Sequence, residues 1–129
     1  MGEHKTVQRT PLGRVKGLGQ HSGAHHWWVQ RLTAVALVPL GLWFIYTLAH
    51  LAPLPAADVR VFLTTPLHMT LMILFLITGF HHAQLGLQVV IEDYVHCEGL
   101  KFALLVGVKF LAVGLGLLGT VCLFSIAHG

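Results

Sequence analysis

Three long apolar segments constrain what this chain can fold into. They run over about 28–51, 61–91 and 100–127, and each exceeds the roughly 20 residues with which a helix crosses the hydrocarbon core of a bilayer. Pro53 and Pro55 follow the first segment, and Gly99 lies in the short loop before the third. The second segment is longer than a bilayer requires, so we expect it to tilt or to project beyond the membrane. The pattern predicts an all-α transmembrane bundle of three helices.

The charged residues are few and unevenly placed. They make up 10% of the 129 residues, against roughly 25% in a soluble domain. The basic residues flank the apolar segments, where they set membrane topology, so the net charge of +3 does not indicate nucleic-acid binding. We expect residues 1–23 to form a cytoplasmic tail and residues 24–129 to form the membrane domain. The N-terminus and the 92–101 loop should lie on the cytoplasmic side, because five basic residues come early in the chain: Lys5, Arg9, Arg14, Lys16 and Arg31.

His81 and His82 lie in the middle of the second apolar segment, where an ionisable side chain is costly and indicates a functional site. At helical spacing, His82 shares one face with Gly79, Ala83 and Gly86. Small residues around an imidazole leave room for a flat porphyrin, so this face could ligate haem iron. Close helix packing through Gly79 and Ala83 would also explain the small residues, although not the imidazole.

His81 points about 100° away from His82 and aligns with Gln84 and Gln88, which predicts a polar seam that bonds to a neighbouring helix. His82 lies about ten residues, or ~15 Å of helix rise, before Glu92, which is near the bilayer midplane. The other histidines of the apolar region fall near one membrane surface or the other. A haem with two histidine ligands would therefore take its second ligand from another chain, in a hetero-oligomer or a homodimer.

Two further groups lie where the helices leave the hydrocarbon. Arg31 is about one turn inside the first segment, where it could pair with a haem propionate or a quinone-site water, or act as a topology anchor. Glu92, Asp93 and Tyr94 end the second segment. A tyrosine hydroxyl can donate to a quinone oxygen and a neighbouring carboxylate can orient it or relay a proton. An ordinary solvated helix end with an interfacial tyrosine is the alternative.

The stretch His82–Val95 resembles the second-helix signature of the hydrophobic membrane anchor subunits of succinate dehydrogenase (respiratory complex II), of the D type and most like bacterial forms. That signature has a histidine, a glycine four residues later, and Asp-Tyr eleven and twelve residues after the histidine, which here are His82, Gly86, Asp93 and Tyr94. The stretch 25–34 is similar to the start of the first helix of that subunit. The resemblance covers roughly residues 24–127.

The resemblance implies half of a heterodimeric haem-binding membrane anchor. A cytochrome b membrane subunit would share one haem b with this chain, with His82 as an axial ligand of the iron. A flavoprotein and an iron–sulfur subunit would dock on the cytoplasmic side. Electrons would then pass from succinate through FAD and iron–sulfur clusters to ubiquinone. Tyr94 and Asp93 would belong to the quinone site, Gly86 would pack against the haem, and Arg31 would lie near a haem propionate or the quinone.

By this resemblance the chain is not catalytic alone, and it would lie in the bacterial inner membrane rather than the mitochondrial one. The residues are also compatible with three other functions. The chain could anchor a fumarate reductase, which shares the fold. It could be another b-type cytochrome subunit, which would usually carry two deep histidines. It could also be a haem-free scaffold or transporter subunit, which would show no Soret band and in which substitution of His82 would have no effect.

Overall fold

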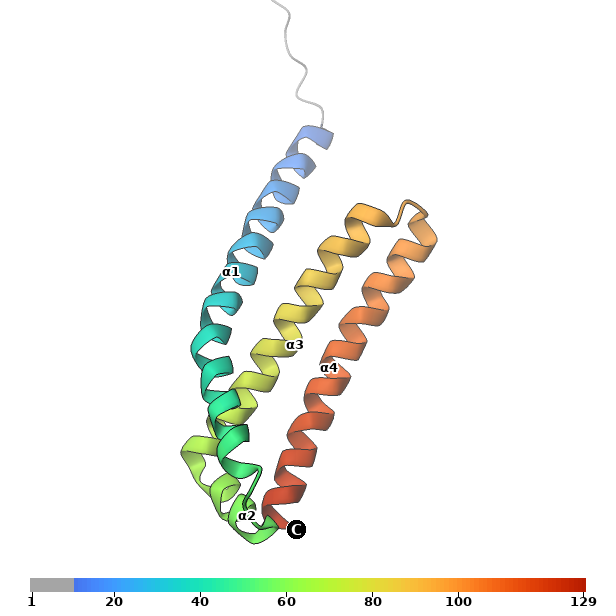
Figure 1. Cartoon of the computed structure of the whole chain (residues 1–129). Coiled ribbons are helices and arrows are strands. Elements are labelled where there is room, and N and C mark those ends of the chain that lie inside the picture. The colour runs from blue at the N-terminus through green and yellow to red at the C-terminus, as the bar shows by residue number, and fades with distance from the viewer. Residues whose placement is uncertain (1–10) are drawn as a thin grey trace, which may run out of the picture.

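The computed structural model describes the backbone of residues 11–129 and the side chains of residues 23–129, and its regular elements are four helices. They are α1 (Pro11–Leu51), α2 (Ala56–Thr64), α3 (Pro66–Tyr94) and α4 (Glu98–His128) (Figure 1). The tail expected over residues 1–23 falls mostly outside the fully described part, where residues 11–22 continue the backbone of α1.

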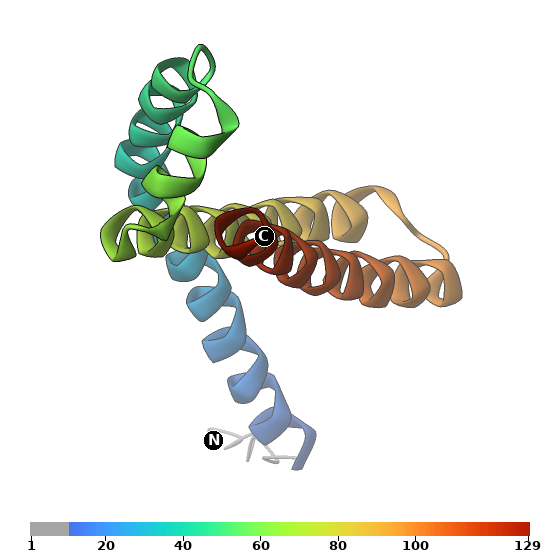
Figure 2. The same ribbon diagram turned by 90° about the horizontal axis from the view of Figure 1, so that it is seen from below.

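Helix α3 lies between α1 and α4 and packs against both (Figure 1). Seen from below, α3 and α4 run side by side, whereas α1 crosses α3 and diverges from it toward its N-terminal end (Figure 2). Three helices are long and apolar enough to cross a membrane: Gly23–Leu51, Pro66–Tyr94 and Glu98–His128. The all-α fold with three candidate spans is therefore confirmed.

The second span begins at Pro66, whereas the sequence pattern placed its start at 61. Thr65 has φ −68° and ψ 122°, an extended conformation, because the proline ring that follows disfavours the helical region for the preceding residue. Proline also lacks the backbone N–H that would continue the helix. Residues 61–64 thus belong to the short helix α2, which Figures 1 and 2 show folded across the end of the bundle beside the C-terminus of α4.

Small residues set how closely the helices approach. A Cβ built on Gly119 of α4 would lie 3.2 Å from the Leu76 Cδ1 atom of α3, and one on Gly116 would lie 3.8 Å from Phe80. On the other side of α3, Phe75 stacks on Phe44 of α1 with ring centroids 4.4 Å apart. Without a hydrophobic driving force between helices in lipid, such close contacts supply much of the packing energy.

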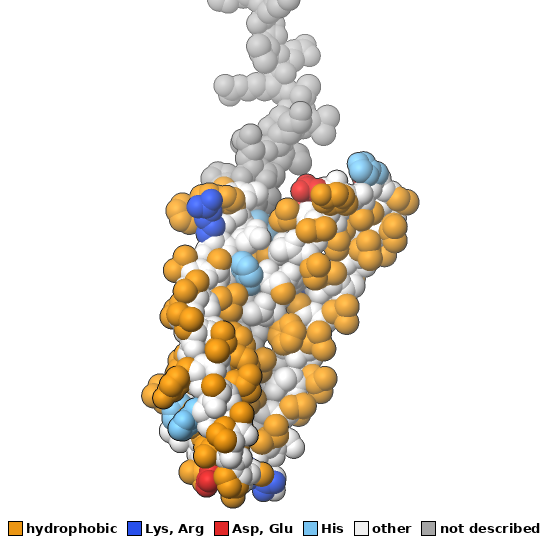
Figure 3. Space-filling view, in the orientation of Figure 1, with side chains coloured by type: hydrophobic (Ala, Val, Ile, Leu, Met, Phe, Trp, Pro, Cys, Tyr) orange, Lys and Arg blue, Asp and Glu red, His pale blue; other side chains and the backbone are white. Residues whose placement is uncertain are grey.

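The compact apolar core lies at the α2 end, where Leu63, Met69, Met72 and Ala127 are buried together. Elsewhere large apolar side chains cover the surface of the three long helices, as Figure 3 shows in orange. A surface so rich in exposed hydrophobic groups is suited to contact with lipid or with other membrane helices.

Candidate functional site

The two central histidines face different neighbours. His82 is half-buried between α3 and α1, and its Nδ1 atom lies 3.0 Å from the Thr33 Oγ1 atom of α1. His81 is exposed and lines a cavity between α3 and α4. The rotation of about 100° between adjacent helical residues therefore gives the two imidazoles separate environments.

The glycines on the His82 face also differ from each other. A Cβ on Gly79 would make ordinary contact with the Leu37 Cδ2 atom of α1, at 3.9 Å. A Cβ on Gly86 would meet nothing within 4 Å. Gly79 thus contributes to the α1–α3 packing, whereas Gly86, one turn beyond His82, leaves open space beside the imidazole.

The cavity beside His81 has a volume of ≈ 440 Å³ and is mainly apolar. Its polar lining consists of His81 and Gln84 from α3 and Lys109 and Thr120 from α4. Gln84 is buried, with 7% of its surface exposed. This cavity lies between α3 and α4, whereas the His82–Thr33 contact lies between α3 and α1.

A chain of side-chain hydrogen bonds runs along α3 toward its C-terminal end. The Gln84 amide nitrogen donates to the Gln88 Oε1 atom at 3.1 Å, and the Gln88 amide nitrogen donates to the Glu92 Oε1 atom at 2.9 Å. The polar seam predicted along Gln84 and Gln88 is therefore present, but its bonds run within α3 rather than to a partner helix.

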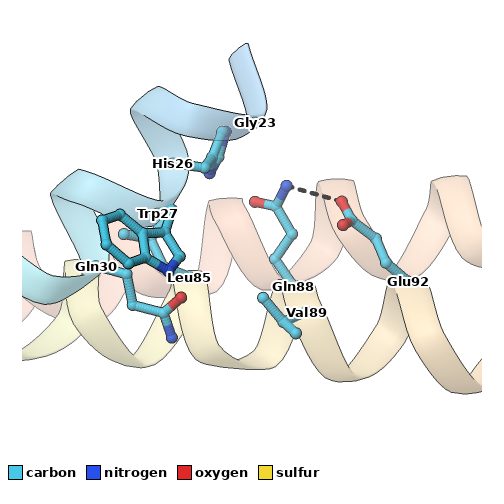
Figure 4. Close-up of a pocket in the computed structure, with 8 residues that line it drawn as sticks. All are labelled: Gly23, His26, Trp27, Gln30, Leu85, Gln88, Val89 and Glu92. Carbon is cyan, nitrogen blue, oxygen red and sulfur yellow. Dashed lines mark hydrogen bonds between the residues drawn. The ribbon is translucent and has the colours of Figure 1, made fainter. Parts of the chain in front are cut away.

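A second cavity of ≈ 400 Å³ lies between α1 and α3 at this end. Figure 4 shows His26, Trp27 and Gln30 of α1 on one side of it and Gln88 and Glu92 of α3 on the other. Gly23, Leu85 and Val89 complete the lining. Of these residues, the sequence indicates Gln88, in the polar seam, and Glu92, at the end of the second apolar segment. The i, i+4 spacing of Gln84, Gln88 and Glu92 is the signal for their hydrogen bonds.

The three residues expected at the quinone site do not form one cavity in this chain. Asp93 and Tyr94 are exposed at the end of α3, with 79% of the Tyr94 surface accessible. Arg31 is exposed on α1, and its Cζ atom lies 4.3 Å from the centroid of the Trp27 ring. This cation–π contact holds the guanidinium beside the indole ring. All three side chains are exposed in this chain.

The described residues contain no cluster of three or more His, Cys, Asp or Glu side chains that could hold a metal ion. His68 lies at the start of α3, far from His82, and its ring stacks on that of Phe62 with 3.7 Å between the centroids.

The model of the family described as Succinate dehydrogenase/Fumarate reductase transmembrane subunit matches residues 6–116 of the chain. A succinate dehydrogenase hydrophobic membrane anchor subunit of Rickettsia bellii is 38% identical over 110 residues, which cover 81% of this chain and 85% of the relative. The protein of that name in Paracoccus denitrificans is 30% identical over 102 residues, covering 78% and 79%.

A succinate dehydrogenase membrane anchor subunit of Reclinomonas americana is 28% identical over 95 residues, which cover 71% of this chain and 79% of the relative. No solved structure matches this chain.

Proposed function

The chain belongs to the transmembrane subunit family of succinate dehydrogenases and fumarate reductases, and on this premise we propose that it binds haem b through His82 and forms part of a quinone-reduction site. Its relatives are membrane anchor subunits of succinate dehydrogenase, which supports the same anchoring role here. The three candidate spans supply the membrane part of that role.

The observation that carries the haem proposal is the placement of His82. Its imidazole is fixed through Nδ1 to Thr33, which leaves Nε2 to bind iron, and the helix face at Gly86 is clear. A porphyrin needs both an imidazole donor and an uncrowded helix surface, so the residues present fit the group. Haem b would supply one-electron redox chemistry between the protein's electron carriers and quinone.

His82 is the ligand we favour over His81. His81 is exposed beside the α3–α4 cavity, and no hydrogen bond to it in the described residues fixes its ring. A metal-bound histidine is normally oriented by a bond from its other ring nitrogen, and His82 has such a bond. The second axial ligand would come from the cytochrome b membrane subunit.

The exposed end of α3 is proposed as this chain's share of the quinone site. Tyr94 would donate a hydrogen bond to a quinone oxygen, and Asp93 would orient it or relay a proton. Arg31 would pair with a haem propionate or a group at the quinone entrance. Because these side chains are accessible and separate in this chain, the iron–sulfur subunit and the cytochrome b subunit would complete the site.

We place the chain in a bacterial inner membrane, with its N-terminus and the α3–α4 loop in the cytoplasm, on the basis of its basic residues. The flavoprotein, with FAD, and the iron–sulfur protein would dock on that side. Electrons would pass from succinate to ubiquinone. The same anchor would serve fumarate reduction, and steady-state rates in both directions with quinones of different potential would distinguish the two.

The experiment that tests the proposal compares His82→Ala with His81→Ala in the complex purified through a tag on this chain. We expect His82→Ala to remove or strongly perturb the reduced-minus-oxidised haem spectrum while flavin content shows that assembly partly survives. His81→Ala should leave the spectrum in place, because that ring faces a different cavity.

An unchanged spectrum in His82→Ala with a lost spectrum in His81→Ala would move the ligand to His81. If neither substitution altered the spectrum, the haem proposal would be wrong for this chain. Loss of flavin together with haem in His82→Ala would instead show failed assembly, and His82→Met, which retains a possible axial ligand, would then replace it.

A further inference from the structure

Thr33 is the residue of α1 that contacts the proposed haem ligand. We propose that Thr33 is a positioning residue: its hydroxyl oxygen accepts a hydrogen bond from Nδ1 of His82, which fixes the imidazole tautomer and aims Nε2 at the iron. This inference rests on the proposed haem ligation by His82. Thr33 lies on α1 and His82 on α3, so the residues around His82 in the sequence do not reveal this partner.

The Thr33 hydroxyl makes two further contacts, both with the backbone of α1. Its Oγ1 atom lies 2.9 Å from the backbone oxygen of Val29 and 2.9 Å from that of Gln30. Two carbonyl oxygens can only accept hydrogen bonds, so the single hydroxyl proton must be directed at them. If that proton pointed to His82 instead, Oγ1 would face two acceptors at 2.9 Å with no proton between them.

The remaining bond therefore runs the other way. With its proton committed to the backbone of α1, Oγ1 offers lone pairs to His82, and Nδ1 at 3.0 Å must be the donor. A neutral imidazole that carries its proton on Nδ1 has its free lone pair on Nε2. Nε2 is thus the atom that can bind iron.

The contact also fixes the plane of the ring. Thr33 and His82 lie on two helices, and Thr33 is itself tied to the backbone of α1 by its own hydroxyl. The Thr33 side chain is half-buried in this interface, where water competes less for the bond than at an exposed site. The packing of α1 on α3, through Gly79 and Leu37, therefore sets the orientation of the imidazole.

Hydrogen bonding from the second ring nitrogen makes an imidazole a stronger electron donor to a metal, and outer-shell partners are worth about 10–100-fold in metal affinity. A stronger donor favours the ferric over the ferrous state and lowers the reduction potential. Loss of the Thr33 acceptor should therefore weaken haem binding and raise the midpoint potential. A tenfold change in the ratio of the affinities for ferric and ferrous haem corresponds to 59 mV in the midpoint potential of a one-electron couple.

The experiment measures the haem in the purified complex of Thr33→Val, Thr33→Ser and Thr33→Ala. Valine keeps the shape of threonine without the hydroxyl, whereas serine keeps the hydroxyl. Thr120→Val is the matched control, because Thr120 of α4 is half-buried and makes the same type of backbone bond, to Gly116 at 2.8 Å, without a histidine partner. The readouts are haem per flavin, the midpoint potential, and the electron paramagnetic resonance g-values of the ferric haem.

We expect valine and alanine to raise the potential and shift the g-values, while serine and Thr120→Val match the wild type. An unchanged potential and unchanged g-values in Thr33→Val with full haem would overturn the inference, as would a serine variant that behaves like valine. If valine prevents assembly, serine and alanine give the same comparison with less steric change. Failure of the proposed function is a separate result: the wild-type complex would lack haem, or His82→Ala would retain it.

Discussion

Gly86 offers a direct test of which helix face the haem would occupy. A Cβ built on Gly86 would meet nothing within 4 Å in this chain, so we expect Gly86→Leu to leave the packing of the three helices unchanged. If the haem lies on this face, four added carbon atoms must enter a packed contact. Overpacking of this kind costs about 1–3 kcal/mol, which corresponds to roughly 5–150-fold weaker haem binding.

The assay is the ratio of haem to flavin in the complex purified through this chain. Gly86→Leu should lower the ratio while flavin content stays near that of the wild type. Gly79→Leu is the matched comparison, because a Cβ there would already contact the Leu37 Cδ2 atom of α1 at 3.9 Å, so leucine would add carbon atoms at the α1–α3 interface. That variant should reduce flavin-containing complex as well as haem. Full haem content in Gly86→Leu would refute the placement of haem on this face.

Three further predictions concern the C-terminal half of α3 and the packing of α3 against α4. Tyr94→Phe should lower quinone reduction by on the order of 10²-fold, as for loss of one preorganised hydrogen-bond donor, with succinate-to-dye transfer retained; equal loss of both rates would indicate failed docking instead. Gln88→Leu leaves the buried Gln84 amide without its acceptor and should cost about 1–3 kcal/mol of stability, measured by thermal denaturation, with no change in the haem spectrum; a changed spectrum would contradict the separation of the two faces of α3. Gly119→Val should lower the thermal midpoint because a Cβ there would lie 3.2 Å from the Leu76 Cδ1 atom, whereas Gly114→Val, where a Cβ has nothing within 4 Å, should not; equal midpoints would contradict the α3–α4 packing.

The number of candidate membrane spans and the central position of His81 and His82 follow from the sequence, because apolar length and the cost of a polar group in lipid are properties of single segments. The second span begins later than the sequence pattern predicts, because the apolar residues Val61, Phe62 and Leu63 precede it and hydropathy does not register the backbone restriction that Pro66 places on Thr65.

The partner of His82 was not predictable in the same way. Thr33 lies 49 residues earlier, and nothing in its local sequence distinguishes it from other threonines that bond to their own helix, such as Thr70 and Thr120. The contact depends on where α1 crosses α3. The same reason applies to the cavity between His26 and Glu92, because its two walls come from helices that meet only in the folded chain.

Haem b binding by this chain, as the membrane anchor of a succinate:quinone oxidoreductase, is open to one decisive measurement. It is a dithionite-reduced minus oxidised spectrum of the complex purified through a tag on this chain, with the co-purifying subunits identified in the same preparation. We expect a b-type α-band together with three partners, one of which carries flavin. A preparation with no haem band and no such partners would contradict it.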